Sequence, residues 1–261
     1  MIGIFDSGIG GLTVVRALKA LRPDLSFVYL GDTARTPYGT KSPETIRRYS
    51  EEAAGFLIKK GARAIIIACN TASSLAADHL REKFPGAPVF EVVAPAVEAA
   101  LSASKNGRIG VIGTRATIAS GIYEQRLRSG RRDIEVFSRP APLLVSLVEE
   151  GWIDTPETSS IVGKYVAPLR EEGIDALILG CTHYPLLKKA IQKFLGRGVR
   201  LVDSAEETAR DVAAVLKKKS LGRERGKGSP SFFVTDAPER FIKVGQRFLG
   251  EKVESAVRIE R

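Results

Sequence analysis

Two cysteines stand directly after short runs of apolar residues, and polar residues follow each of them. Cys69 lies in ACNTAS (68–73), Cys181 lies in GCTHYP (180–185), and the chain contains two cysteines in all. The free N–H groups and the dipole at a helix N-terminus stabilise a thiolate, which makes such a cysteine a usable base or nucleophile. We expect both cysteines to stand at helix N-termini and to be reactive, although a lone cysteine after a core strand is often a small buried hydrophobe.

Four kinds of chemistry are open to this pair of thiols. A disulfide is disfavoured in a reducing compartment, and a metal site would need ligands beyond Cys69, Cys181 and His183. A cysteine hydrolase needs a histidine that reaches the thiol from another element, whereas His183 lies two residues from Cys181 and His79 lies on an apparent surface helix. Removal of a proton from one face of a carbon and its return to the other face needs two opposed bases. Two matched thiols fit that last requirement, with no metal and no cofactor.

The elements that must position the thiols alternate along the chain. Short β-branched runs are separated by longer segments of helical period, which favours βα units and parallel sheets covered on both faces. The predicted strands are IGIF, SFVYL, AIIIA, PVFEV, RIGVI, IEVF, ALILG, RLVD and SFFVT. Helix N-caps are predicted at Ser42 with Pro43, Thr155 with Pro156, Ser204 with Glu207 and Asp236 with Glu239.

An internal repeat indicates two related halves. Residues 2–20 are echoed by 109–127, and residues 62–84 are echoed by 174–194, each of the latter pair with a cysteine just after its strand. We therefore predict an α/β protein of two similar domains with mainly parallel sheets, related by a pseudo-two-fold axis. The N-terminal domain is expected to comprise 1–93 plus 206–261, and the second domain 94–205. Chance similarity between βα units is the competing interpretation.

The predicted strand ends place the polar residues at one cleft between these halves. Asp6, Cys69, Thr114 and Cys181 all follow strands, and ligands of parallel α/β sheets bind beyond the carboxyl ends of the strands.

The glycine turn DSGIGG (6–11) has two interpretations. A dinucleotide site is a weak match, because Thr13 replaces the third glycine of the fingerprint and Asp6 would place a negative charge near a pyrophosphate, although Asp32 is spaced for a ribose contact. A carboxylate site fits better, since turn N–H groups and the hydroxyls of Ser7, Thr71 and Thr182 are suitable donors.

Charge and hydrophobic patterning limit the kinds of partner that the sequence predicts. The formal net charge is +10, which would suit a nucleic-acid binder, but Glu is interleaved with Lys and Arg along the predicted helices. We therefore expect a solvated surface and no specific nucleic-acid partner. The basic run 217–230 is predicted to be a flexible linker. No run approaches the roughly 20 apolar residues of a membrane helix, and the N-terminus lacks the pattern of a signal peptide, so we expect a cytoplasmic protein without a membrane partner.

The ordered motifs resemble the glutamate racemase family. They are DSGIGGL (6–12), PYG (37–39), ACNTAS (68–73), GT (113–114), LVEEG (147–151) and GCTHYP (180–185), and the resemblance covers about residues 1–210. It implies a cofactor-independent enzyme that interconverts L- and D-glutamate and supplies D-glutamate for bacterial peptidoglycan.

The same resemblance assigns residues to roles. Cys69 and Cys181 would be the two acid/base residues, one on each face of the substrate α-carbon, with Asp6 assisting Cys69, and His183 and Glu149 assisting Cys181. Glu149 is chosen over Glu150 because of its spacing to Gly151. The expected substrate-binding residues are Asp6, Ser7, Tyr38, Gly39, Asn70, Thr71, Thr114, Thr182 and His183. Where the family often has Cys-Pro-Leu, this chain has Ala141, Pro142 and Leu143; that cysteine is not catalytic in the family.

Alternatives stay open at this point. The substrate could be aspartate or another acidic amino acid, and the protein could be a non-catalytic binding module for a dicarboxylate or a basic partner of nucleic acid. The favoured partner is glutamate, and we expect a homodimer, although the sequence does not identify which face would pair.

Overall fold

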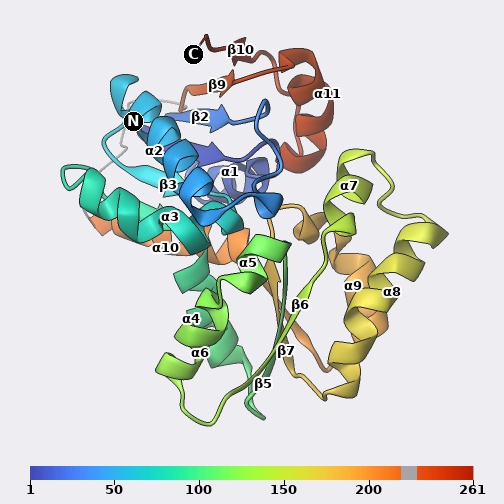
Figure 1. Cartoon of the computed structure of the whole chain (residues 1–261). Helices are drawn as coiled ribbons and strands as arrows, with labels where there is room; N and C mark the ends of the chain where they lie inside the picture. The colour runs from blue at the N-terminus through green and yellow to red at the C-terminus, as the bar shows by residue number, and fades with distance from the viewer. Residues whose placement is uncertain (219–227, 261) are drawn as a thin grey trace.

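Two parallel β-sheets form the framework of the protein (Figure 1). A computed structural model describes residues 1–218 and 228–260. The six-stranded sheet has the order β10 (Val257–Arg258), β9 (Pro230–Val234), β2 (Phe27–Gly31), β1 (Ile2–Asp6), β3 (Ile65–Ile67) and β4 (Val89–Glu91). The four-stranded sheet has the order β6 (Glu135–Pro140), β5 (Arg108–Gly113), β7 (Ala176–Gly180) and β8 (Arg200–Asp203). Strands β1 to β9 match the nine predicted strands, and the predicted α/β class is confirmed.

The two sheets repeat one topology. The order β2-β1-β3-β4 in one half corresponds to β6-β5-β7-β8 in the other, and every pair in both runs is parallel. Strands β9 and β10 extend the six-stranded sheet next to β2. Equivalent strands β3 and β7 are the two that precede the cysteines, so the repeat seen in the sequence corresponds to a repeat of the sheet topology.

Helices cover both faces of each sheet. In the half with the larger sheet they are α1 (Leu12–Leu21), α10 (Ser204–Lys218) and α11 (Pro238–Leu249) on one side, and α2 (Pro43–Lys59) and α3 (Asn70–Lys83) on the other. In the other half they are α7 (Leu143–Glu149), α8 (Pro156–Glu171) and α9 (Lys188–Leu195) on one side, and α4 (Val93–Ala103) and α6 (Ile122–Gly130) on the other. Shorter elements are η1 (Tyr38–Thr40), α5 (Arg115–Ala119) and η2 (Tyr184–Leu187).

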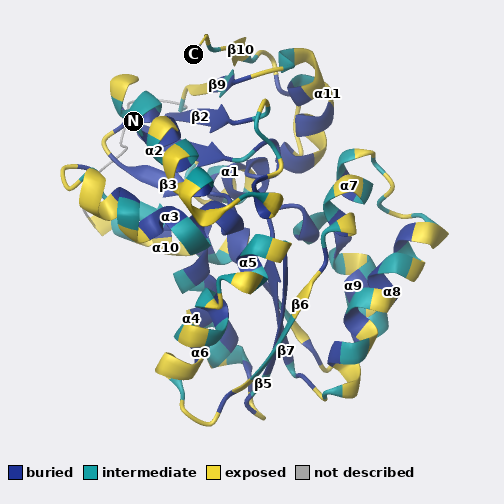
Figure 2. Ribbon diagram, in the orientation of Figure 1, coloured by how far each residue is buried: buried dark blue, intermediate teal, exposed yellow. Residues whose placement is uncertain are grey.

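Alternation of side chains along the strands builds the core. In β7, Leu177 and Leu179 join the apolar cluster beneath α8 and α9, whereas Ala176 and Ile178 join the cluster beneath α4 and α6. This period of two is the geometry of an extended strand buried on both faces. Strands β2, β3 and β7 are buried along their length, whereas the edge strands β6 and β10 are partly or fully exposed (Figure 2). One apolar cluster contains residues of both halves, so their packing against each other is continuous.

The helix N-caps test the local predictions. Ser42 accepts a hydrogen bond from the Thr45 N–H at 3.3 Å, and Thr155 accepts one from Thr158 at 3.2 Å, as predicted. The cap at Ser204 is wrong, because α10 already begins at Ser204 and Asp203 accepts the Ala205 N–H at 2.8 Å.

The cap at Asp236 is also wrong. Ala237, with φ of 47°, precedes α11 and no side chain caps that helix. Asp236 instead donates its own backbone N–H to Thr33 Oγ1 at 2.9 Å, so the tertiary contact with the β2 loop fixes this helix start.

Two further sequence predictions concern the basic linker and membrane-spanning helices. Most of the basic run 217–230 lies outside the described residues. Across the described ranges, none of the helices combines the length and the apolar character needed to cross a membrane.

Candidate active site

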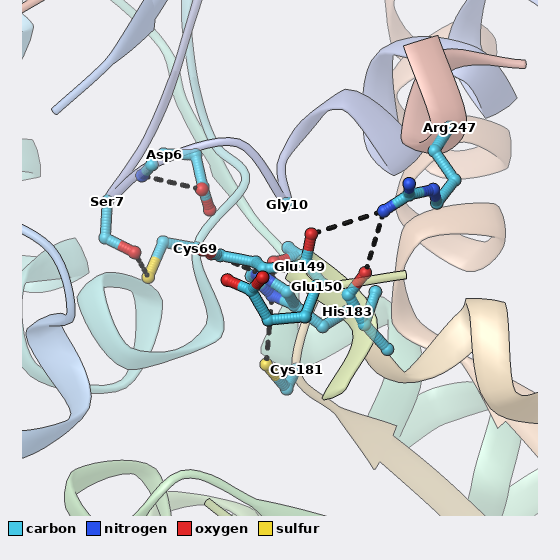
Figure 3. A network of polar contacts seen from close by, with 12 residues as sticks. Asp6, Ser7, Gly10, Cys69, Glu149, Glu150, Cys181, His183 and Arg247 are labelled. Atoms are coloured by element: carbon cyan, nitrogen blue, oxygen red, sulfur yellow. Dashed lines mark hydrogen bonds and ion pairs between the residues drawn. The ribbon is translucent and has the colours of Figure 1, made fainter. Parts of the chain in front are cut away.

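Four strand ends converge between the two halves. Asp6 ends β1 and Cys69 follows β3 in one half, while Thr114 follows β5 and Cys181 follows β7 in the other. Asp6 and both cysteines are buried, and Figure 3 shows the two sulfur atoms on different sides of one group of polar side chains. Parallel packing brings the carboxyl ends of these strands to the same edge, which explains why residues far apart in sequence meet here.

Cys69 stands at the N-cap position of α3, as predicted. Its thiol donates to Ser7 Oγ at 3.4 Å. Burial, and then the negative charge of Asp6, raise the pKa of Cys69 to about 12. The loss of solvation therefore outweighs the helix N-terminus, and Cys69 is a thiol at neutral pH.

The expectation of a helix N-terminus at Cys181 is wrong. Cys181 is followed by a turn, in which its carbonyl accepts the Tyr184 N–H at 3.1 Å, then by the short helix η2, and α9 begins only at Lys188. A charged neighbour takes the place of the helix: Cys181 Sγ lies 3.7 Å from Nδ1 of His183.

His183 connects the Cys181 thiol to a carboxylate. Its Nε2 lies 3.0 Å from Glu149 Oε1. Burial opposes the charged imidazolium, but the hydrogen bonds with Cys181 and Glu149 raise the pKa of His183 to about 10. Glu149 behaves in the complementary way: burial opposes its ionisation, yet its contacts with His183 and then Arg240 lower its pKa. His183 and Glu149 thus form a charged pair at neutral pH.

Asp6 is a buried carboxylate with one free oxygen. Its Oδ2 accepts the Gly8 N–H at 2.9 Å, while Oδ1 has no hydrogen-bond partner among the described residues. Burial raises the pKa of Asp6, against the lowering influence of His183 and of backbone N–H groups. An unpaired buried acceptor is costly, so this oxygen is a candidate partner for a cationic or N–H group of a ligand.

Two glycines allow the halves to approach closely. A Cβ on Gly10 would lie 2.2 Å from Thr182 Oγ1 and 2.6 Å from His183 Cε1. A Cβ on Gly39 would lie 2.6 Å from Thr114 Cβ. The glycine turn therefore serves contact between the halves, a requirement that the sequence pattern did not reveal.

The hydroxyl groups predicted to bind substrate lie in two places. Thr71 Oγ1 is 2.8 Å from Thr114 Oγ1 and 3.1 Å from Thr117 Oγ1, which links α3 to the start of α5. Thr182 Oγ1 lies 3.4 Å from Nδ1 of His183, and Thr13 donates to the Thr182 carbonyl at 3.2 Å.

Two other predicted binding residues have side chains engaged elsewhere. The Tyr38 hydroxyl donates to Asp32 Oδ2 at 2.6 Å. Asn70 accepts from the Tyr123 hydroxyl at 2.6 Å and donates to Ser204 at 3.4 Å. Both side chains therefore already have partners within the protein.

Sequence reasoning missed several neighbours of the site. Arg240 and Arg247 of α11 contact the end of α7, the Phe248 ring lies 5.1 Å from that of His183, and Tyr123 holds Asn70. Nothing in their local pattern marks them.

His79 does not belong to the site. Its Nε2 lies 2.9 Å from Glu51. Among the described residues, no group of three or more His, Cys, Asp or Glu side chains is arranged to hold a metal ion.

Comparison with known proteins places this arrangement in a family. Residues 12–212 match the family model described as Asp/Glu/Hydantoin racemase. A glutamate racemase from Geobacter metallireducens is 47% identical over 253 residues, which cover 97% of this chain and 93% of the relative.

Solved structures agree with the sequence match. Glutamate racemase isoform RacE1 from Bacillus anthracis has a TM-score of 0.95 at 38% identity and covers 100% of this chain and 97% of its own. Glutamate racemase from Francisella tularensis, solved in complex with D-glutamate, has a TM-score of 0.92 at 38% identity and covers 99% of this chain and 97% of its own. The chain belongs to the Asp/Glu/hydantoin racemase family and is an enzyme with glutamate racemases as its relatives.

Proposed function

We propose that the protein interconverts L- and D-glutamate without a cofactor, with Cys69 and Cys181 as acid and base on opposite faces of the substrate α-carbon. The observation that carries the proposal is the placement of the two thiols at equivalent strand ends of the repeated halves. Each thiol also has its own polar neighbours, Ser7 and Asp6 for Cys69, and His183 with Glu149 for Cys181.

The charges near the two thiols differ. Cys69 is a thiol, and the protonated His183 places a positive charge beside Cys181 Sγ. Cys181 can then remove the α-proton of one enantiomer while the Cys69 thiol delivers a proton to the opposite face.

The other enantiomer requires the reverse pair. Cys69 must first lose its proton. Asp6 is suited to accept that proton, because its charge acts on the Cys69 thiol and its own pKa is raised. His183 can return a proton to Cys181 across their 3.7 Å contact.

Substrate recognition follows from the unsatisfied and clustered polar groups. The free Oδ1 of Asp6 suits the substrate ammonium. The hydroxyls of Ser7, Thr71, Thr114 and Thr182, with the backbone groups of Tyr38, Gly39 and Asn70, suit its two carboxylates. Because an α-proton is far less acidic than a thiol, the developing carbanion needs such fixed donors in a closed site that excludes water.

Deuterium incorporation tests the reaction. In ²H₂O, with L-glutamate and no additive, the purified protein is expected to incorporate deuterium at Cα while optical rotation is lost; initial rates on aspartate measured in parallel decide between the two acidic amino acids. Cys69→Ser and Cys181→Ser should each abolish racemisation. A single variant that still exchanges the α-proton of one enantiomer without inverting it would identify the face served by the remaining thiol. Full racemase activity in either variant would contradict the two-thiol mechanism.

The biological setting is part of the proposal. A racemase of this kind would supply D-glutamate for bacterial peptidoglycan, so depletion of the protein in its host should be rescued by added D-glutamate. The mechanism needs reduced thiols, which fits a cytoplasmic enzyme, and cell fractionation tests this. We also propose a homodimer, which sedimentation equilibrium tests.

The division into domains is likewise proposed. We assign residues 1–93 plus 206–261 to one domain and 94–205 to the other. The membership of β9 and β10 in the sheet of β1 supports the first assignment. Hydrogen exchange that separates two cooperative units at these boundaries would test it.

A further inference from the structure

Helix α11 joins the two halves at the active site. Its buried residues, including Phe241 and Phe248, pack with α1 in the half that carries the six-stranded sheet. In Figure 1 the same helix lies beside α7 of the other half. The polar side of α11 therefore faces the end of the helix that carries Glu149.

Two arginines connect α11 to that end, and a ring contact connects it to His183. Arg240 Nη2 lies 3.1 Å from Glu149 Oε2. Arg247 donates to the carbonyls of Val148 at 3.3 Å and Glu149 at 3.2 Å, the contacts drawn from Arg247 in Figure 3. The Phe248 ring meets the His183 ring edge to face at 5.1 Å.

The two carboxylate oxygens of Glu149 have different partners. Oε1 contacts His183 and Oε2 contacts Arg240. A carboxylate held at both oxygens cannot rotate away from the imidazole without losing the second contact. A continuous polar chain thus runs from Arg240, whose side chain is 51% exposed, through Glu149 and His183 to the buried sulfur of Cys181.

We propose that Arg240 is a positioning residue for the Cys181 side of the reaction: it fixes the Glu149 carboxylate against His183, and it does so across the junction between the two halves. The inference rests on the proposed function. Because Arg240 and Glu149 belong to different halves, the chain is complete only when the halves are packed together as seen here. Packing of the two halves is thereby coupled to the position of His183 beside Cys181.

Partial solvation limits the size of the effect. A cavity of about 130 Å³ lies next to the ion pair and is lined by, among others, Thr36, Glu149 and Arg240. Solvent screens the charge of a side chain that is 51% exposed. Arg240→Gln is therefore expected to lower kcat/KM by roughly fivefold, equivalent to about 1 kcal/mol. Arg240→Lys, which keeps the cation but not the fork geometry, should recover part of that loss.

A matched control is available on the same helix. Lys243 is an exposed cation three residues further along α11, and Lys243→Gln removes the same charge away from Glu149. This variant should keep kcat/KM within about twofold of the wild type.

The isotope effect separates positioning from a general loosening of the site. The two enantiomers have equal free energy in solution, so any variant must change kcat/KM equally in both directions. The primary deuterium isotope effect on kcat/KM, measured with Cα-deuterated L- and D-glutamate, can differ between the two enantiomers. If the Cys181 step is slowed selectively, the isotope effect rises for the enantiomer deprotonated by Cys181 and falls for the other.

The outcomes are distinct. A fivefold loss in Arg240→Gln, partial recovery in Arg240→Lys, and isotope effects that move in opposite directions would support the inference. Equal kcat/KM in Arg240→Gln and Lys243→Gln, or isotope effects that move together for both enantiomers, would overturn it. Failure of the wild type to exchange the α-proton of glutamate would instead overturn the proposed function.

Discussion

Glu149 Oε1 lies 3.0 Å from Nε2 of His183, although 34 residues separate them in the chain. Glu149 ends α7 and His183 precedes η2, so two elements of the same half must pack together to form the pair. The carboxylate favours a protonated imidazole, and the imidazole contacts the Cys181 sulfur at 3.7 Å. This relationship distinguishes the surroundings of Cys181 from those of Cys69.

Glu149→Gln should impair catalysis. The neutral amide no longer favours the imidazolium next to Cys181, and we expect kcat for glutamate racemisation to fall by roughly 10- to 100-fold. Glu254→Gln is the control, because Glu254 has a side chain 79% exposed and its ion pair is with Lys252, away from His183. Equal activity of the two variants would argue against a role for the Glu149 contact with His183.

The pH dependence of stability should report His183. Its pKa is raised to about 10 in the folded protein, so its contribution to stability is fully present below the unfolded value, near 6.5, and is lost as the pH rises toward 10. The free energy of unfolding in urea should therefore decline over this interval more steeply for the wild type than for His183→Asn.

NMR measures the same group directly. His79→Gln leaves His183 as the remaining histidine of the two in the chain. Its ring signals should stay those of an imidazolium at pH 8 and titrate near pH 10. A titration near 6.5 would contradict the assigned charge state.

Gly10→Ala should disturb the contact between the halves. The added Cβ would lie 2.2 Å from Thr182 Oγ1, so the turn that contains Cys181 and Thr182 must move. We expect racemase activity to fall more than about tenfold and stability to drop by about 1–3 kcal/mol, as for overpacked sites. Gly55→Ala, within α2, meets nothing within 4 Å and should be neutral or stabilising by up to about 1 kcal/mol. Thermal denaturation and racemisation rates compare the two variants.

Asp6→Asn should separate stability from activity. Burial raises the pKa of Asp6; the unfolded chain therefore loses this proton first, and the ionised carboxylate costs stability at pH 8. We expect the neutral amide to raise the free energy of unfolding by about 1 kcal/mol while racemase activity falls more than about tenfold. Asp154→Asn, with a side chain 73% exposed, should change neither by much. A large loss of stability in Asp6→Asn would contradict the proposed cost.

Local patterns were enough to predict much of the framework. The central strands are runs of mostly apolar residues, many of them β-branched, and this composition is typical of strands buried on both faces. Ser42 and Thr155 were recognisable as caps because a cap bonds to an N–H three residues away. Ser204 and Asp236 resembled caps equally well, but contacts outside their own helices decided where those helices begin.

The sequence by itself determined which reactive groups are available: two thiols after equivalent strands, with a histidine and hydroxyls near them in the chain. It also contains a repeat that predicts two similar sheets. Tertiary structure decided how these groups are paired. The turn after β7 and the packing of α7 within the same half gave Cys181 a charged histidine in place of a helix terminus. Packing of the two halves brought Arg240 to Glu149, and Asp6 Oδ1 is buried without a hydrogen-bond partner among the described residues. The physical reason is range: periodicity and capping act within a few residues, whereas charge, burial and hydrogen bonds act between any groups that the fold brings within a few ångströms.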